Sequence, residues 1–129
     1  MTDLEIGGWD RHHAGTPHLV LRTSAPAEEA IGVLVAELAR ERFKAKERGP
    51  DHFRSRFVDW FDVASGTFNW TTIEGRATPD GGGTAVTLTV VSGEEYRRAP
   101  KRAAIALTTA VQQLRAHGHE VSPGAWTLA

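Results

Sequence analysis

The sequence predicts an α+β fold: a curved antiparallel sheet of five or more strands, one helix after the first strand, and a long C-terminal helix packed on one face. Three observations predict it. Several short runs alternate apolar and polar residues, turn-forming residues separate these runs, and two stretches carry apolar residues at helical spacing. With 129 residues, of which 40% are hydrophobic, the chain fits one domain with a single core.

The first predicted elements are a strand and a helix. Residues 18–23 alternate as a half-buried strand does. Ser24 follows as a candidate helix cap, and Pro26 and the acids at 28 and 29 suit the first turn of a helix. The helix should end near Arg40. Its predicted apolar stripe consists of Ala30, Ile31, Val33, Leu34, Val35 and Leu38.

Residues 42–61 predict a β-hairpin, because the turn sequence Gly49-Pro50-Asp51 separates two alternating runs. If Arg48 faces His52, then Lys46 faces Arg54. This register gives the hairpin an aromatic inner face, with Phe43 opposite Phe57 and Glu47 opposite Phe53, and a basic outer face. The basic residues all stand at even positions: Arg42, Lys44, Lys46, Arg48, Arg54 and Arg56.

A second hairpin follows, in which residues 79–83, PDGGG, join two alternating runs. In the first run we expect the side that carries Phe68, Trp70, Thr72, Glu74 and Arg76 to face the core. This requires the loop 62–66 to set the strand parity, as a bulge there could do. In the second run we expect the valines and Leu88 to face inward and the threonines outward: Val86, Leu88 and Val90 against Thr87 and Thr89.

The strongest helical pattern lies near the C-terminus. It begins with Pro100 in the first turn and runs to about Ala116. Its predicted buried residues are Ala103, Leu107, Ala110, Val111 and Leu114. Residues 1–17 show no sustained period and are predicted to form an N-terminal arm or loop. The domain then spans residues 18–117, and residues 118–129 form a C-terminal tail.

One stretch, FNWTTIEGRATPDGGGTAVTLTV, joins a tryptophan strand through a glycine-rich turn to a threonine-rich strand, and an amphipathic helix follows from Pro100. Over about residues 18–117 the chain thereby resembles the helix-grip superfamily of START-domain, polyketide-cyclase and pollen-allergen-like (Bet v 1-like) proteins. It departs from that pattern in having five predicted strands where six or seven are usual, and one helix after the first strand where two are usual. The resemblance implies a cavity for a small apolar molecule between sheet and C-terminal helix, and no single activity.

Charged residues on the predicted inner face suggest where such a ligand would bind, because unpaired charges are rarely buried. In this interpretation an apolar or amphipathic molecule lies against an aromatic wall, and Glu74 and Arg76 orient it. The alternative is that both charges lie at strand ends and meet solvent or each other. The candidate ligand-binding residues are Phe57, Phe61, Trp70, Glu74, Arg76 and Leu107.

Two other functions remain open. The hairpin could bind a polyanion, although a net charge of -1 and the lack of an exposed aromatic series make nucleic acid an unlikely partner. The basic face could equally be solvated. The chain could instead be a protein–protein or homodimerisation module, with Val58 and Trp60 exposed at a sheet edge. The candidate polyanion-binding residues are Lys44, Lys46, Arg48, Arg54 and Arg56.

The sequence shows no catalytic motif, so no enzymatic activity is assigned, and it implies no cofactor. Cysteine is absent, which excludes disulfides and thiolate metal sites. The pairs His12-His13 and His117/His119 lack the spacing of a metal site, so no metal is expected. The start of the chain resembles no signal peptide and no run is apolar enough for a membrane span, so we expect a cytoplasmic protein without membrane contact.

Overall fold

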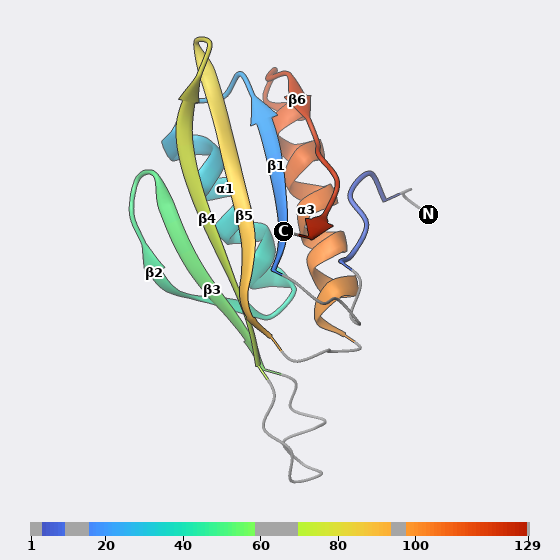
Figure 1. The fold of residues 1–129 in the computed structure, drawn as a ribbon. Coiled ribbons are helices and arrows are strands. Elements are labelled where there is room, and N and C mark those ends of the chain that lie inside the picture. The colour runs from blue at the N-terminus through green and yellow to red at the C-terminus, as the bar shows by residue number, and fades with distance from the viewer. Residues whose placement is uncertain (1–3, 10–15, 59–69, 94–97, 129) are drawn as a thin grey trace, which may run out of the picture.

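The computed structural model describes residues 4–9, 16–58, 70–93 and 98–128, and it has the predicted α+β architecture. Along the chain lie β1 (Pro17–Thr23), α1 (Ala27–Arg40), β2 (Phe43–Arg48), β3 (His52–Val58), β4 (Trp70–Asp80), β5 (Gly83–Gly93), α3 (Ala99–Ala116), β6 (Val121–Ser122) and β7 (Thr127–Leu128) (Figure 1). The predicted fold class is confirmed. None of the helices in these ranges is long and apolar enough to cross a membrane.

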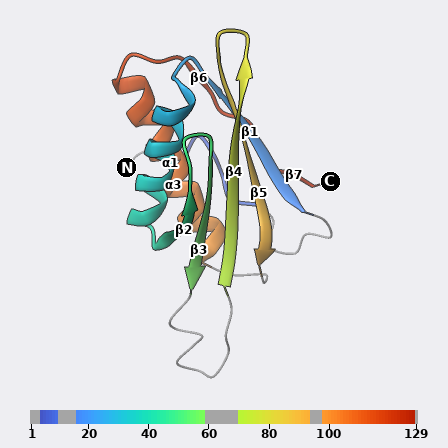
Figure 2. The same cartoon turned by 90° about the vertical axis from the view of Figure 1, so that its left-hand side faces the viewer.

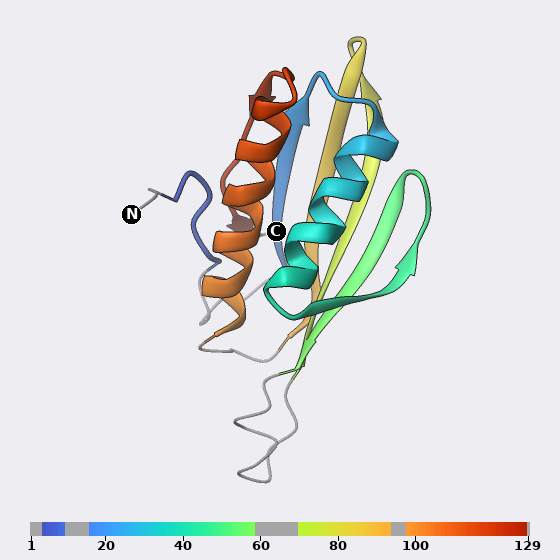
Figure 3. The ribbon, with the colours of Figure 1, turned by 180° about the vertical axis from the view of Figure 1, so that it is seen from behind.

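The described strands form one antiparallel sheet in the order β2-β3-β4-β5-β1-β6, and β7 also pairs with β1. The two helices lie side by side on one face of this sheet (Figure 3). Seen from the side, they stand on one side of the strands (Figure 2). We call the side of the sheet turned away from the helices the open face.

The two helices follow the sequence pattern closely. α1 ends at Arg40 and α3 spans the predicted range, and their apolar stripes are buried against the sheet and each other. The start of α1 differs from the prediction, because Pro26 is the N-cap residue and no side chain in the described part of the chain caps the helix. Ser24 instead accepts a hydrogen bond from the backbone N–H of Glu120 at 2.8 Å.

Residues 4–9 pack against α3, although their sequence shows no period. Ile6 exchanges hydrogen bonds with the Thr108 hydroxyl, and Ile6 and Trp9 belong to the hydrophobic core. The Trp9 ring meets Trp126 edge to face, with centroids 5.2 Å apart, and the Trp126 indole N–H donates to the Gly7 carbonyl. Segments from the two ends of the chain therefore contact each other beside α3.

The hairpin of β2 and β3 has the predicted turn but only part of the predicted register. Phe43 pairs with Phe57 as expected, with ring centroids 5.1 Å apart. A bulge at Lys46 then shifts the pairing, so that Arg54 faces Glu47 and Phe53 faces Arg48. The expected pairs Lys46 with Arg54, Arg48 with His52 and Glu47 with Phe53 are wrong. The bulge replaces a pair of like charges by a pair of opposite charges, which favours this register.

The predicted inner face of β4 is also wrong. Ile73 and Ala77 are buried on the helix side, whereas Glu74 is partly exposed and Arg76 is exposed on the open face. The loop 62–66, to which the expected bulge was assigned, lies outside the described residues. On β5 the prediction is confirmed: Val86, Leu88 and Val90 are buried, and Thr87 and Thr89 lie on the other side.

Packing of Phe53 against Gly75 explains the orientation of β4. The two residues are paired across β3 and β4, and the Phe53 ring occupies the space that a side chain at position 75 would fill. Phe53 is almost completely buried. A glycine at position 75 therefore lets the aromatic ring pack closely against β4 on the helix side.

We predict that Gly75→Ala destabilises the protein by about 1–3 kcal/mol, because the added methyl group displaces the buried Phe53 ring. Chemical denaturation monitored by circular dichroism would measure the change. Gly7→Ala is the matched control, since a Cβ at Gly7 meets no atom within 4 Å. Equal stability of the Gly75→Ala variant and the wild type would contradict the close packing.

Candidate functional site

A hollow of about 430 Å³ lies on the open face, across strands β2 to β5. Most of the residues that line it are polar or charged, in contrast to the apolar cavity that the resemblance implies. The side chains that matter to its chemistry are Glu47, Arg54, Glu74, Arg76, Thr87 and Thr89.

Strand register places these side chains in two neighbouring rows. In one row Arg54 of β3 stands between Glu47 of β2 and Glu74 of β4, and Thr89 of β5 follows. In the next row, Arg76 stands between His52 and Thr87. Paired residues in antiparallel strands project to the same side, so both rows face the same hollow.

Arg54 and Glu74 form an ion pair across β3 and β4. Arg54 donates from Nε at 3.0 Å and also from Nη2, and both bonds end on Glu74 Oε1. The hydrogen bond to Glu74 and its negative charge raise the pKa of Arg54 above its ordinary value. Both side chains are substantially exposed, so the pair orients the two groups more than it stabilises the fold.

Arg76 differs from Arg54 in having no such partner. Its side chain is exposed, and within the described ranges it makes no hydrogen bond or ion pair. Thr87 lies directly opposite on β5. A guanidinium that no described residue hydrogen-bonds, beside a hydroxyl that can donate a hydrogen bond, suits a carboxylate or another oxyanion.

One end of the hollow lies at the turn between β2 and β3, where His52 stands near two acids. Its Nδ1 lies 3.0 Å from Asp51 Oδ1, and its Nε2 lies 3.8 Å from Glu47 Oε1. The hydrogen bond from His52 lowers the pKa of the Asp51 carboxyl below its ordinary value, and the nearby Arg76 charge adds to this effect. Asp51 therefore stays ionised at lower pH than an isolated aspartate.

The structure does not bring together the six residues predicted to bind an apolar ligand. Phe57 and Leu107 are buried in the core on the helix side, while Glu74 and Arg76 lie on the open face. Phe61 lies outside the described residues, and so does the side chain of Trp70, whose backbone pairs with Val58. On the helix side, the hydroxyls of Ser55 and Thr71 are fully buried and find no hydrogen-bond partner among the residues that the structure describes.

The five residues predicted to bind a polyanion also separate. Lys44 and Lys46 are exposed on the edge strand β2, and Arg54 is paired with Glu74. Arg48 lies on the helix side of the sheet, where its Nη2 reaches α1 at Gly32. Arg56 is half-buried and has polar contacts. The continuous basic row predicted from the even positions is therefore interrupted.

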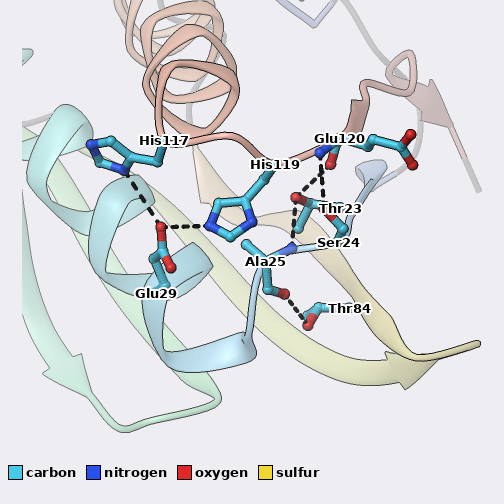
Figure 4. Close-up of polar contacts among 8 residues, drawn as sticks. All are labelled: Thr23, Ser24, Ala25, Glu29, Thr84, His117, His119 and Glu120. Atoms are coloured by element: carbon cyan, nitrogen blue, oxygen red, sulfur yellow. Dashed lines mark hydrogen bonds and ion pairs between the residues drawn. The ribbon is translucent and has the colours of Figure 1, made fainter.

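The C-terminal histidines take part in a polar network between the ends of α1 and α3 (Figure 4). His119 Nε2 and His117 Nδ1 lie 2.9 and 3.4 Å from the same oxygen of Glu29. Nearby, the Thr23 hydroxyl donates to the Glu120 carbonyl at 2.7 Å. This network joins the chain after α3 to β1 and to the first turn of α1. Across the described ranges, no three His, Cys, Asp or Glu side chains are arranged to hold a metal ion.

Comparison of the chain with protein-family models, with curated proteins and with solved structures finds no match. The resemblance to the helix-grip superfamily therefore stays a prediction. The candidate site rests on the geometry of the open face alone. Glu74 and Arg76 were singled out by their charges in an otherwise apolar pattern, whereas Thr87, Thr89 and His52 carried no sequence signal for this site.

We predict that His52→Leu raises the pKa of Asp51 toward its ordinary value, because leucine has no donor to replace the hydrogen bond that chiefly lowers it. An NMR titration of the Asp51 side-chain carboxyl would measure the change. His18→Leu, which alters a histidine on β1, should leave the Asp51 titration where it is. An Asp51 pKa unaffected by His52→Leu would show that the His52 contact does not form in solution.

Proposed function

We propose that the protein binds a small polar molecule with a negatively charged group in the hollow of the open face. One observation carries this proposal: the guanidinium of Arg76 faces the hollow without a hydrogen bond or ion pair to any described residue. The volume of about 430 Å³ lies within the range of small-molecule sites.

The neighbouring charges make Arg76 the anchor for the negative group. Arg54 is also in the hollow, but Glu74 already neutralises it. The hydroxyls of Thr87 and Thr89 can donate to an oxyanion beside Arg76. Because the hollow is open to solvent, we expect modest affinity that falls as ionic strength rises.

A second candidate keeps the ligand between sheet and C-terminal helix, as the resemblance implies. The buried hydroxyls of Ser55 and Thr71 favour it, since buried polar groups without a partner are unusual and a ligand or water could satisfy them. Against it, Glu74 and Arg76, which were expected to orient that ligand, lie on the other side of the sheet. The open face is therefore the better-supported site.

We predict that small anions, such as acetate or inorganic phosphate, shift the backbone amide signals of Thr87, Thr89 and Arg76 in two-dimensional ¹⁵N–¹H NMR spectra. Arg76→Gln should weaken this binding roughly twofold to fivefold, the loss expected for one solvent-exposed ion pair. Lys101→Gln is the matched control, because it removes an exposed positive charge from α3.

The outcomes separate the two candidates. Shifts confined to Phe57, Leu107 and their neighbours on the helix side would contradict the open-face site and favour the interior one. The open-face proposal would also be overturned if Lys101→Gln weakened binding as much as Arg76→Gln, since binding would then reflect overall charge.

A further inference from the structure

The arrangement of charges on β4 narrows the class of molecule that the open-face hollow would take. Glu74 and Arg76 are two residues apart on one strand and project to the same side, with α-carbons roughly 7 Å apart. Thr89 and Thr87 lie opposite them on β5. A ligand in the hollow therefore meets a carboxylate and a guanidinium next to each other.

Glu74 retains hydrogen-bonding capacity despite its ion pair. Both hydrogen bonds from Arg54 end on Oε1, and no described residue donates to Oε2. A carboxylate has about four acceptor positions on its two oxygens. Glu74 Oε2 can therefore accept from a donor or cationic group of a ligand while Arg54 stays in place.

The charges around the hollow also balance. Among the side chains that line the hollow, two carboxylates, Glu47 and Glu74, stand against two guanidiniums, Arg54 and Arg76, so these four charges sum to zero. The Asp51 carboxylate, at the turn beside the hollow, adds a negative charge near Arg76. A dianion such as phosphate would gain from Arg76 but would also meet the repulsion of Glu47 and Glu74. A molecule with one negative and one positive group avoids this repulsion, because its negative group can bind the Arg76 guanidinium and its positive group can bind Glu74 Oε2.

We propose that the ligand is a small zwitterion, whose carboxylate binds Arg76 and whose ammonium group binds Glu74 Oε2. This inference rests on the proposed function, because it assigns the ligand class of the same hollow. The hydroxyls of Thr87 and Thr89 add hydrogen bonds to the carboxylate. Free amino acids and related amino carboxylates have this chemistry.

The test compares 4-aminobutyrate with butyrate and with butylamine, which carry one charge each on a chain of the same length. Dissociation constants come from NMR titrations of the full chain, followed at Thr87 and Thr89. We expect 4-aminobutyrate to bind roughly twofold to fivefold more tightly than butyrate, the range that one exposed ion pair supplies. Inorganic phosphate should bind more weakly than 4-aminobutyrate.

Glu74→Gln provides the decisive variant. It removes the acid that meets the ammonium group and frees Arg54, so butyrate should bind at least as tightly as in the wild type while the preference for 4-aminobutyrate disappears. Arg76→Gln should weaken both ligands, and Lys101→Gln neither. Because Glu74 is partly exposed, we expect the Glu74→Gln variant to fold, and the dispersion of its ¹⁵N–¹H NMR spectrum would confirm this.

The results distinguish the two proposals. If butyrate or phosphate binds at Arg76 but 4-aminobutyrate binds no more tightly, or if the preference survives Glu74→Gln, the zwitterion is wrong and the open-face site stands. If none of the probes shifts Thr87 or Thr89, both proposals fail.

Discussion

The close packing of Phe53 on Gly75 is the constraint on which the two faces of the sheet depend. With helices on only one face, each strand residue must point either into the core or toward the open face. The ring of Phe53 fills the position of a side chain at Gly75, which fixes the odd-numbered residues of β4 toward the helices. Glu74 and Arg76 then necessarily lie on the open face, where register brings them beside Arg54 and the threonines of β5.

The bulge at Lys46 is the second feature that shapes the open face, because it determines which charged side chains pair across β2 and β3. Without it, Lys46 would face Arg54 and the hairpin would present a row of like charges. With it, Glu47 faces Arg54 on one side and Glu74 faces it on the other. The positive charge of the hairpin is thus partly neutralised, and the open face is not a continuous basic surface. Its candidate anion-binding group is Arg76, which has no such partner among the described residues.

Much of the fold could be predicted because periodicity and turn chemistry are local. The limits of α3, the turn at Gly49 to Asp51 and the outward threonines of β5 all follow from them. The inner face of β4 could not, because Trp70 and Phe68 outweighed Ile73 in the pattern, and the role of Gly75 depends on a ring from another strand. The bulge at Lys46 and the burial of Ile6 and Trp9 likewise arise from tertiary contacts. For the candidate site, the sequence drew attention to Glu74 and Arg76 but placed both on the wrong face of the sheet.

Nuclear Overhauser effects between side chains test the orientation of β4 most directly, since every statement about the open face depends on it. The structure predicts contacts between the ring protons of Phe53 and the α-protons of Gly75, and between the side chains of Glu74 and Arg54. Contacts from the side chain of Glu74 or Arg76 to the methyl groups of Leu107 would place both charges on the helix side. That result would contradict the open-face site.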